Sequence, residues 1–424
     1  MKKYRNICVI GLGYVGLPLA VEFSKKYNIV GFDKNKFRIN QLKRGIDLNS
    51  QLTKKDIKKK NLKFTFKKKE IKDSQIYIIT VPTPVTNNKK PNLNPLKDAA
   101  LTVAKNLSRG DFVILESTVY PGLTEEFLVP ILEANSNLKL NKHFFVGYSP
   151  ERISPGDKLR TLKNVKKVVS GSNSYSGKII YRLYKKIINA GVYLAPSIKV
   201  AESSKILENV QRDINISLMN EASLIFDRLN IDTYEVLKAA STKWNFLRFT
   251  PGLVGGHCIS VDPYYLKYKA EKLGYKPSVI SSGRNVNENM IKVISSKIKT
   301  FFKKRKKIKK IRIGIMGLTF KENCPDIRNS QIFKLLHFLK KQYFEIEILD
   351  PLLTISEVPK PFKKNFVKKF SKKKDCLVLA TPHKEFLNYK INYYEDNLNE
   401  NSMIFDVKKV IRFNFNKRIN LYSF

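Results

Sequence analysis

The chain has 424 residues, of which 42% are hydrophobic and 27% are charged. This length and balance are enough for two or three globular domains with hydrophobic cores, and they exclude a collagen-like or wholly disordered chain. No apolar run reaches the roughly 18 residues that span a bilayer, so the sequence predicts no membrane partner.

The cysteines and the net charge narrow the class of protein further. The four cysteines, Cys8, Cys258, Cys324 and Cys376, are scattered without metal-ligand spacing, which predicts a reducing, cytoplasmic location and no metal site. The formal net charge of +44 is typical of nucleic-acid-binding proteins. However, the excess is lysine spread in short clusters at 58–60, 67–69 and 303–310. We interpret it mainly as solvated surface. Attraction of an anionic substrate is a secondary alternative, and nucleic acid is kept as a further alternative partner.

The first predicted elements are a strand, a tight glycine turn and a helix. The apolar run 7–10 leads into the glycine loop 11–16, after which apolar residues follow at helical spacing, and a second strand at 29–32 ends at Asp33. Further strands at 76–81 and 112–116 extend this alternation. The pattern predicts a doubly wound parallel sheet.

The glycine loop predicts a dinucleotide site. Glycines let the backbone approach a pyrophosphate at a helix N-terminus, and Asp33 is placed to accept hydrogen bonds from ribose hydroxyls. We predict NAD rather than NADP, because the Asp33 carboxylate would repel the extra phosphate that Arg38 could contact. A turn without a ligand, or a signal peptide formed by Lys2, Lys3 and the apolar run, are the alternatives. The predicted cofactor contacts here are Gly11, Gly13, Tyr14, Val15, Gly16, Asp33 and Arg38.

In the second half of the chain, the alternation of strands and helices gives way to one long helical period and then resumes. A helical period runs from 197 to 229, too long for one small core, which predicts a helix that bridges two lobes or pairs with a second copy. Strands at 311–316, 345–349 and 376–380, with a helix at 332–339, predict a second α/β domain. The expected fold class is therefore α/β, with two Rossmann-like doubly wound domains joined by a long central helix. The predicted domains are 1–195, 196–302 and 303–424.

Two short segments carry candidate chemistry. Cys258 lies in a glycine-rich turn with Asp262 four residues later, so a helix that began there would place both side chains on one face. A thiol near a helix N-terminus is favoured as thiolate, the nucleophile towards aldehydes, although a small apolar filler is the alternative. Lys205 and Asn209 lie one helical turn apart and predict a pair that stabilises an oxyanion, unless they belong to a solvated surface.

Taken together, the motifs resemble the UDP-glucose/GDP-mannose dehydrogenase family, whose members oxidise C6 of a nucleotide sugar to a carboxylate. The resemblance spans nearly the whole chain. Its motifs are the glycine loop with Asp33 and Arg38, the loops 82–84 and 117–122, the segment 149–152, Lys205 with Asn209, the segment 255–258 with Asp262, and the segment 317–321 with Asp326 and Arg328.

Within this family, the stretch 243–265 resembles the branch that acts on UDP-N-acetylhexosamines. UDP-glucose members usually have Gly-Gly-Ser-Cys-Phe and Lys-Asp where this chain has His257, Ile259 and Val261-Asp262. The resemblance implies UDP-GlcNAc or UDP-GalNAc as substrate and does not separate these epimers. UDP-glucose and UDP-ManNAc remain alternatives.

The resemblance also implies a mechanism and a set of roles. Two oxidations would share one site and pass hydrides to NAD, with Cys258 holding the aldehyde as a thiohemiacetal and then a thioester that water hydrolyses. The second α/β domain would bind UDP, and the central helix would form the core of a homodimer or larger oligomer. The implied catalytic residues are Cys258, Lys205, Asn209, Asp262, Glu151 and Thr118. The implied substrate contacts are Glu151, Arg152, Lys205, Asn209, Arg248, Gly255 and Lys321, and the further cofactor contacts are Thr83, Thr118 and Arg328.

Overall fold

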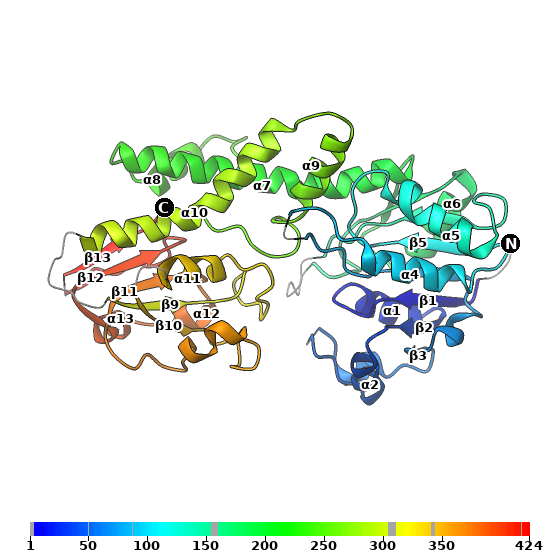
Figure 1. Cartoon of the computed structure of the whole chain (residues 1–424), viewed down its shortest axis with the longest axis horizontal. Coiled ribbons are helices and arrows are strands. Elements are labelled where there is room, and N and C mark those ends of the chain that lie inside the picture. The colour runs from blue at the N-terminus through cyan, green and yellow to red at the C-terminus, as the bar shows by residue number, and fades with distance from the viewer. Residues whose placement is uncertain are drawn as a thin grey trace. The chain divides into compact units, whose positions relative to one another are not determined.

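The computed structural model describes residues 4–49, 51–86, 88–153, 160–303, 311–340, 344–416 and 418–424. The lysine cluster at 303–310 lies, except for Lys303, outside these residues, as do Lys2 and Lys3. The chain forms two compact units, the first comprising Met1–Glu208 with Tyr264–Lys276 and the second Asn209–Pro263 with Pro277–Phe424. Figure 1 shows the parallel sheet of each unit.

The first unit is built on an eight-stranded sheet in the order β3-β2-β1-β4-β5-β6-β7-β8. Its first six strands have the Rossmann order, with a switch point between β1 and β4 where a ligand can bind. All described neighbours are parallel except β6 and β7, which are antiparallel. The strands are β1 (Asn6–Ile10), β2 (Asn28–Phe32), β3 (Leu62–Thr65), β4 (Ile76–Ile79), β5 (Phe112–Leu115), β6 (Phe145–Tyr148), β7 (Lys167–Gly171) and β8 (Val192–Leu194).

Helices cover this sheet because its central strands are apolar on both faces. Every residue of β4 and β5 is buried, as expected for parallel strands inside an α/β domain. The predicted strands at 76–81 and 112–116 are therefore confirmed, each ending one or two residues earlier than expected. The helical segments are α1 (Gly16–Ser24), α2 (Lys36–Arg44), α3 (Lys54–Ile57), η1 (Lys68–Ile71), α4 (Asn94–Ala104), η2 (Thr124–Leu128), α5 (Val129–Ser136) and α6 (Ser174–Lys185).

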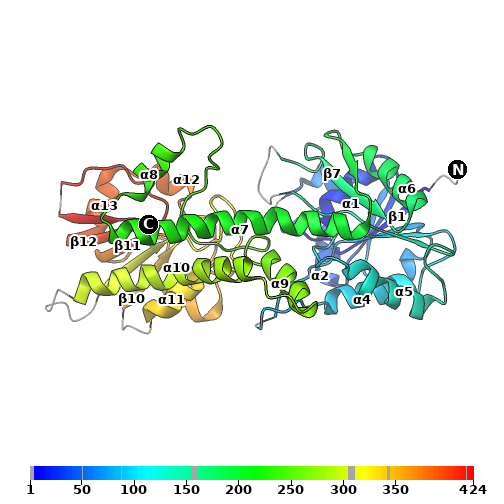
Figure 2. The ribbon, with the colours of Figure 1, turned by 90° about the horizontal axis from the view of Figure 1, so that it is seen from above.

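The long central helix is α7 (Ile198–Arg228), with 31 residues, and Figure 2 shows it from end to end. Its bounds agree with the period predicted at 197–229. In the second unit, Asp213 of α7 forms buried contacts with Arg284 and Asn287 of α10, at 2.7 Å each. None of the described helices is long and apolar enough to cross a membrane. The helices that follow α7 are α8 (Thr233–Ala240), α9 (Asp262–Lys272) and α10 (Ser278–Lys303).

The second unit contains a five-stranded sheet in the order β10-β9-β11-β12-β13, in which all neighbours are parallel. Side chains alternate between two cores: Ile313 and Ile315 of β9 face one, and Met316 faces the other. Both faces are thus covered, and the predicted fold class is confirmed. The elements are β9 (Arg312–Met316), α11 (Ile332–Lys340), β10 (Glu345–Leu349), η3 (Lys360–Asn365), β11 (Lys374–Leu379), α12 (Lys384–Leu387), α13 (Ile391–Asn397), β12 (Leu398–Asp406) and β13 (Ile419–Tyr422).

Candidate functional site

The glycine loop of the first unit connects β1 to α1 at the switch point of the sheet. A Cβ atom at Gly16 would lie 1.9 Å from the Gly11 carbonyl oxygen and 2.3 Å from Thr80 Oγ1, so the protein itself requires this glycine. A Cβ atom at Gly13 would meet nothing within 4 Å. Because no protein atom explains Gly13, the open space beside it fits a ligand that approaches the backbone closely, such as the pyrophosphate of NAD. Tyr14 and Val15 complete the turn, and Val15 is the N-cap of α1.

Asp33 and Arg38 lie next to this loop, as predicted, and both support it. Asp33 Oδ2 accepts a hydrogen bond from the Leu12 N–H at 2.9 Å, which fixes the carboxylate at the end of β2. Arg38 is buried and donates from Nε to the Leu12 carbonyl at 3.1 Å and from Nη2 to Asp47 Oδ1 at 2.8 Å. These contacts hold Arg38 in place beneath the loop. They favour NAD over NADP, since the guanidinium is already paired with Asp47.

An apolar cavity of about 570 Å³ opens beside Asp33. This volume lies within the range of about 300–1,000 Å³ that is typical of small-molecule sites. The apolar walls and the carboxylate at one edge suit an adenosine, with the base between the walls and the ribose at Asp33. The residues that line it include Ile10, Gly11, Phe32, Asp33, Val81, Pro82, Ala99 and Leu101.

The loops after β4 and β5 hold the predicted contacts Thr83 and Thr118. Thr83 Oγ1 donates to the Thr118 carbonyl at 2.6 Å, so the two loops are joined. The Tyr265 hydroxyl donates to the Thr83 carbonyl and extends the same network. Sequence reasoning gave Tyr265 no role, and nothing in its spacing indicates this contact.

Buried Glu202 of α7 fixes the end of the Thr118 loop. Its carboxylate accepts hydrogen bonds from the Gly122 N–H at 2.5 Å and from the Thr124 N–H at 3.0 Å. Burial raises the pKa of Glu202 to about 7, against the hydrogen bonds from Thr124 and Gly122, which lower it. The loop that carries Thr118 is therefore attached to the same helix that carries Lys205, which is also buried.

Glu151 and Arg152 follow β6 in the first unit. Glu151 Oε1 accepts hydrogen bonds from the Arg152 and Ile153 N–H groups, at 2.6 and 2.7 Å. Arg152 forms an ion pair with Glu208 of α7 at 2.8 Å and donates to the Lys166 carbonyl at 2.8 Å. The structure thus gives Arg152 a role in holding this segment against α7.

The cysteine loop belongs to the second unit, apart from the helix that continues it. Gly256 has φ = +87°, and a Cβ atom there would lie 2.7 Å from the Phe320 ring, so only glycine is tolerated. Asn329 donates to the Gly256 carbonyl at 3.1 Å and Gln331 to the Val254 carbonyl at 3.0 Å. The Cys258 side chain is exposed, in contrast to the other three cysteines. The filler alternative for Cys258 is therefore not supported.

The structure does not meet the condition under which Cys258 and Asp262 would share a helix face. Helix α9 begins at Asp262 rather than at Cys258, although the Asp262 N–H donates to the Cys258 carbonyl at 2.8 Å. Asp262 is buried and accepts a hydrogen bond from Asn209 Nδ2 at Oδ2, at 2.5 Å, whereas the Cys258 side chain is exposed. Asn209 and Asp262 form a buried pair, and Cys258 lies four residues before the first residue of α9.

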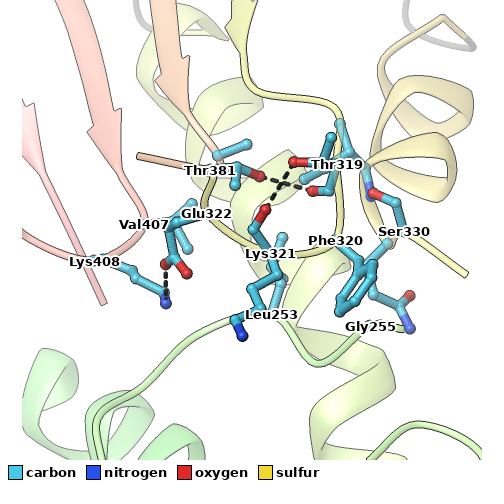
Figure 3. Close-up of a pocket in the computed structure, with 13 residues that line it drawn as sticks. Leu253, Gly255, Thr319, Phe320, Lys321, Glu322, Ser330, Thr381, Val407 and Lys408 are labelled. Atoms are coloured by element: carbon cyan, nitrogen blue, oxygen red, sulfur yellow. Dashed lines mark hydrogen bonds and ion pairs between the residues drawn. The ribbon is translucent and has the colours of Figure 1, made fainter. Parts of the chain in front are cut away.

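A second pocket lies in the second unit, at the carboxyl ends of β9, β11 and β12. This is the switch point of the sheet, where open α/β domains bind ligands. Figure 3 shows the side chains that line this pocket. Lys408 forms an ion pair with Glu322, Thr381 Oγ1 donates to the Thr319 carbonyl, and Thr319 Oγ1 donates to the Lys321 carbonyl. Gly255 of the cysteine loop also lines it. The lining residues are Leu253, Gly255, Thr319, Phe320, Lys321, Glu322, Ser330, Gln331, Ile332, Ala380, Thr381, Val407 and Lys408.

The turn of this pocket repeats the design of the first glycine loop. Asp350, after β10, accepts a hydrogen bond from the Leu318 N–H at 2.6 Å, as Asp33 does from Leu12. The Asp350 carboxylate is shielded from solvent, because its Oδ2 lies 3.3 Å from His383 Nε2 and both side chains are buried. His383 Nδ1 accepts the Asn323 N–H at 2.9 Å and so holds the loop that carries Lys321. Sequence reasoning missed this pair, although an acid directly after the strand 345–349 was a readable signal.

The structure places the remaining predicted contacts as follows. Arg328 forms a bidentate ion pair with Asp326, whose Oδ2 also lies 3.7 Å from His257 Nε2. Burial raises the pKa of Asp326, but the contacts with His257 and Arg328 outweigh it and hold the pKa well below its usual range. Arg248 donates to the Ser241 carbonyl at 3.4 Å and is not among the residues that line the second pocket.

The predicted catalytic residues therefore fall into two groups. Cys258, Asn209 and Asp262 belong to the second unit, and Thr118, Glu151 and Lys205 to the first. A dinucleotide loop on one parallel sheet, with a second pocket beside an exposed cysteine on another, defines a two-domain dehydrogenase of the dinucleotide-dependent class.

The comparison with family models identifies the family. Residues 5–188, 199–289 and 314–413 match the NAD binding, central and UDP binding domains of UDP-glucose/GDP-mannose dehydrogenases. The chain belongs to the UDP-glucose/GDP-mannose dehydrogenase family. It is an NAD-dependent nucleotide-sugar 6-dehydrogenase, and the predicted cofactor and UDP-sugar class of substrate are confirmed.

Individual relatives and structures agree with this family. The chain is 50% identical to a UDP-N-acetyl-D-glucosamine 6-dehydrogenase of Salmonella typhi over 90% of each chain. It is 46% identical to protein CapL of Staphylococcus aureus over 96% of each. A solved UDP-D-ManNAc dehydrogenase from Pyrococcus horikoshii covers 98% of each chain with a TM-score of 0.88 and 28% identity.

Proposed function

We propose that this protein oxidises C6 of a UDP-N-acetylhexosamine, UDP-GlcNAc or UDP-GalNAc, to the uronic acid in a four-electron reaction. The observation that carries the proposal is the exposed Cys258, held on a loop whose Gly255 lines the pocket of the UDP-binding domain. This arrangement supports the attachment of a bound sugar to the thiol. The 50% identity to a UDP-GlcNAc enzyme, against 28% to the UDP-D-ManNAc dehydrogenase, favours the gluco substrate class. UDP-glucose and UDP-ManNAc remain the alternatives.

The first half of the proposed reaction makes and captures an aldehyde. The C6 hydroxyl loses its proton to Lys205 or to a water held with Asp262, and C6 becomes an aldehyde carbon. One NAD, when bound, would accept the hydride of this oxidation, and a second NAD would accept that of the next. The Cys258 sulfur then attacks the aldehyde carbon, a C–S bond forms, and the oxygen takes up a proton to give a thiohemiacetal.

The second half converts the captured carbon into an acid. The thiohemiacetal gives up its remaining hydride and its hydroxyl proton to become a thioester. Water adds to the thioester, the C–S bond breaks, and a carboxylate and the free thiol remain. Lys205 and Asn209 stabilise the oxyanions of these steps, and Glu151, supported by Thr118, positions the water. Asn209 suits this role because its pairing with Asp262 fixes its amide.

Further proposals concern the rest of the chain. Lys321, on the loop held by His383, would contact the UDP-sugar, and Arg248 and Arg152 would assist substrate binding. Arg328 would reach the cofactor. We also propose that the chain forms at least a homodimer through α7, that it works in the cytoplasm, where NAD and nucleotide sugars are available, and that 1–195, 196–302 and 303–424 act as its three domains.

The test measures NADH formation by absorbance and quantifies the uronic acid produced. Four substrates are compared in parallel: UDP-GlcNAc, UDP-GalNAc, UDP-ManNAc and UDP-glucose. We expect two NADH for each N-acetylated gluco or galacto sugar consumed. Reduction with UDP-glucose or UDP-ManNAc alone would contradict the substrate class. One NADH per sugar, with an aldehyde as product, would contradict the four-electron reaction.

Cys258→Ser tests the covalent step. We expect uronic acid formation to fall by at least about 10³-fold, because the hydroxyl is a much weaker nucleophile than the thiolate. Cys376→Ala, which changes a buried cysteine of β11 in the same unit, is the matched control and should retain activity. Normal uronic acid formation by Cys258→Ser would exclude the thioester route.

A further inference from the structure

A buried lysine lies directly behind the proposed catalytic carboxylate Glu151. Lys167, the first residue of β7, is 2% exposed, although it is charged. Its Nζ lies 2.8 Å from Glu116 Oε2 and 3.5 Å from Glu151 Oε2. A buried cation of this kind is costly unless it is paired, so its two carboxylate partners define its role.

The sheet explains why these residues meet. β6 and β7 are antiparallel, with Gly147 opposite Gly171 and Tyr148 opposite Ser170. Continued outward, the same register brings Glu151, after β6, opposite Lys167 at the start of β7. Opposite residues of an antiparallel pair point to the same face, within reach of one another. A parallel β7 would start at the other edge of the sheet and could not supply this cation.

The rest of the cluster fixes the lysine. Glu116 follows β5 and is fully buried, and its Oε1 accepts a hydrogen bond from the Tyr184 hydroxyl of α6. Lys167 Nζ also lies 5.7 Å from the centre of the Tyr184 ring. Burial alone lowers the pKa of Lys167, but the carboxylates of Glu116 and Glu151 raise it above its ordinary value, so the ammonium is kept.

The contacts of Glu151 are divided between its two oxygens. Oε1 accepts the N–H groups of Arg152 and Ile153, and Oε2 faces the ammonium of Lys167. The side chain is 11% exposed, so one edge of the carboxylate stays accessible. The backbone fixes one oxygen, and the lysine decides the direction of the other.

We infer that Lys167, fixed by Glu116 and Tyr184, is a positioning residue that holds the Glu151 carboxylate in the orientation needed to direct water at the thioester. The inference rests on the proposed function of Glu151. Lys167 itself contacts neither substrate nor cofactor in this proposal. Its replacement should therefore change the rate of the hydrolytic step and not the affinity for substrate.

The experiment is a double-mutant cycle of Lys167→Met and Glu151→Gln in the full chain, with kcat, KM for both substrates, and the intact mass of the enzyme during turnover. We expect Lys167→Met to lower kcat about tenfold without raising either KM, as for coupled residues in contact. A sugar adduct should accumulate on Cys258, because hydrolysis is slowed. In the Glu151→Gln background, Lys167→Met should have almost no further effect.

Three further variants serve as controls, the first of them for folding. Glu116→Gln with Lys167→Met removes both charges of the buried pair and should show the same slow hydrolysis with a melting temperature close to wild type. Lys167→Arg restores a cation and should recover part of the rate. Lys163→Met, which removes a partly exposed lysine paired with Glu22, is the matched control.

Each outcome bears on a separate claim. Additive effects of Lys167→Met and Glu151→Gln, or a normal kcat in a folded Lys167→Met enzyme, would overturn the positioning role. The proposed function would instead be overturned if the wild-type enzyme formed no adduct and produced only one NADH per sugar. The two failures are distinguished by the wild-type measurement alone.

Discussion

At the scale of single residues, the cofactor loop separates glycines that the fold needs from a glycine that a ligand needs. Gly16 is closed off by the Gly11 carbonyl and by Thr80, whereas Gly13 has open space beside it. A methyl group at the two positions should therefore have different consequences, although both belong to one motif.

We predict that Gly16→Ala lowers the melting temperature by several degrees, because a contact of 1.9 Å forces the backbone to move. Gly13→Ala should leave the melting temperature within about one degree of wild type and weaken NAD binding at least tenfold, since its methyl group points at the pyrophosphate. Calorimetry of unfolding and of NAD binding checks both. Equal loss of stability in the two variants would contradict the distinction.

Glu202 gives a pH dependence with a definite sign. Its folded pKa of about 7 lies above the ordinary value of 4.5, so the folded state binds this proton more tightly than the unfolded state. The stabilisation of the folded state by the protonated Glu202 is therefore complete below pH 4.5 and is lost as the pH rises through 7. By linkage the loss amounts to about 3 kcal/mol of the free energy of unfolding.

We predict that Glu202→Gln becomes more stable relative to wild type as the pH rises from 4.5 to 8, because the amide does not titrate whereas Glu202 loses its proton in this range. Urea unfolding of both proteins at a series of pH values measures it. Thr102→Ser, a conservative change in the same unit, serves as control. Parallel pH curves for wild type and Glu202→Gln would show that Glu202 does not titrate in this range.

At the scale of elements, α7 carries an exposed apolar stripe along its length. Val200, Leu207, Leu218 and Ile225 are between 44% and 60% exposed. Their spacings of 7, 11 and 7 residues place them within about 20° of one another on a helix with 3.6 residues per turn. Such a stripe costs free energy in water, which supports the proposed pairing of α7 with a second copy.

We predict that Leu218→Glu weakens this oligomer at least tenfold in dissociation constant, because a carboxylate would have to be buried in an apolar interface. Sedimentation equilibrium or light scattering at several concentrations measures it. Arg212→Glu, exposed about 120° around the same helix, is the control and should leave the oligomer intact. An unchanged mass for Leu218→Glu, or a monomeric wild type, would refute pairing through this stripe.

At the scale of the whole molecule, the two units repeat one design and use it differently. Each has a sheet whose first two strands in the chain are parallel, with a turn after the first strand and an acid after the second that accepts a hydrogen bond from that turn. In the first unit Asp33 stays partly exposed beside the cavity, but in the second His383 covers Asp350. The first arrangement suits ribose hydroxyls, and the second can only stabilise its own loop.

We predict that NAD and UDP protect separate segments from hydrogen exchange. NAD should slow exchange at 11–16 and 33–38, and UDP at 317–324 and 381–384, with each ligand stabilising by about 2.7 kcal/mol at a hundred times its dissociation constant. Gly13→Ala should lose the protection by NAD and keep that by UDP. Protection of 317–324 by NAD alone would contradict the assignment of the two pockets.

The alternation of strands and helices, the glycine loop and the long period of α7 were all predicted from sequence, because they are local patterns with a fixed physical meaning. Strand ends moved by only a residue or two. The shared helix face of Cys258 and Asp262 depended on a helix that begins at Cys258, and this condition is not met, because α9 begins at Asp262.

By itself the sequence determined the family and the cofactor and indicated candidate residues for the chemistry, since these inferences depend on residue types at short spacings. Only the tertiary structure decided which groups are buried together. Lys167 lies beside Glu151 because β7 is antiparallel to β6. Glu202 of α7 accepts a hydrogen bond from the Gly122 N–H and so holds the loop that carries Thr118. Strand direction and helix packing are set by contacts between residues far apart in the chain, and no local pattern records them.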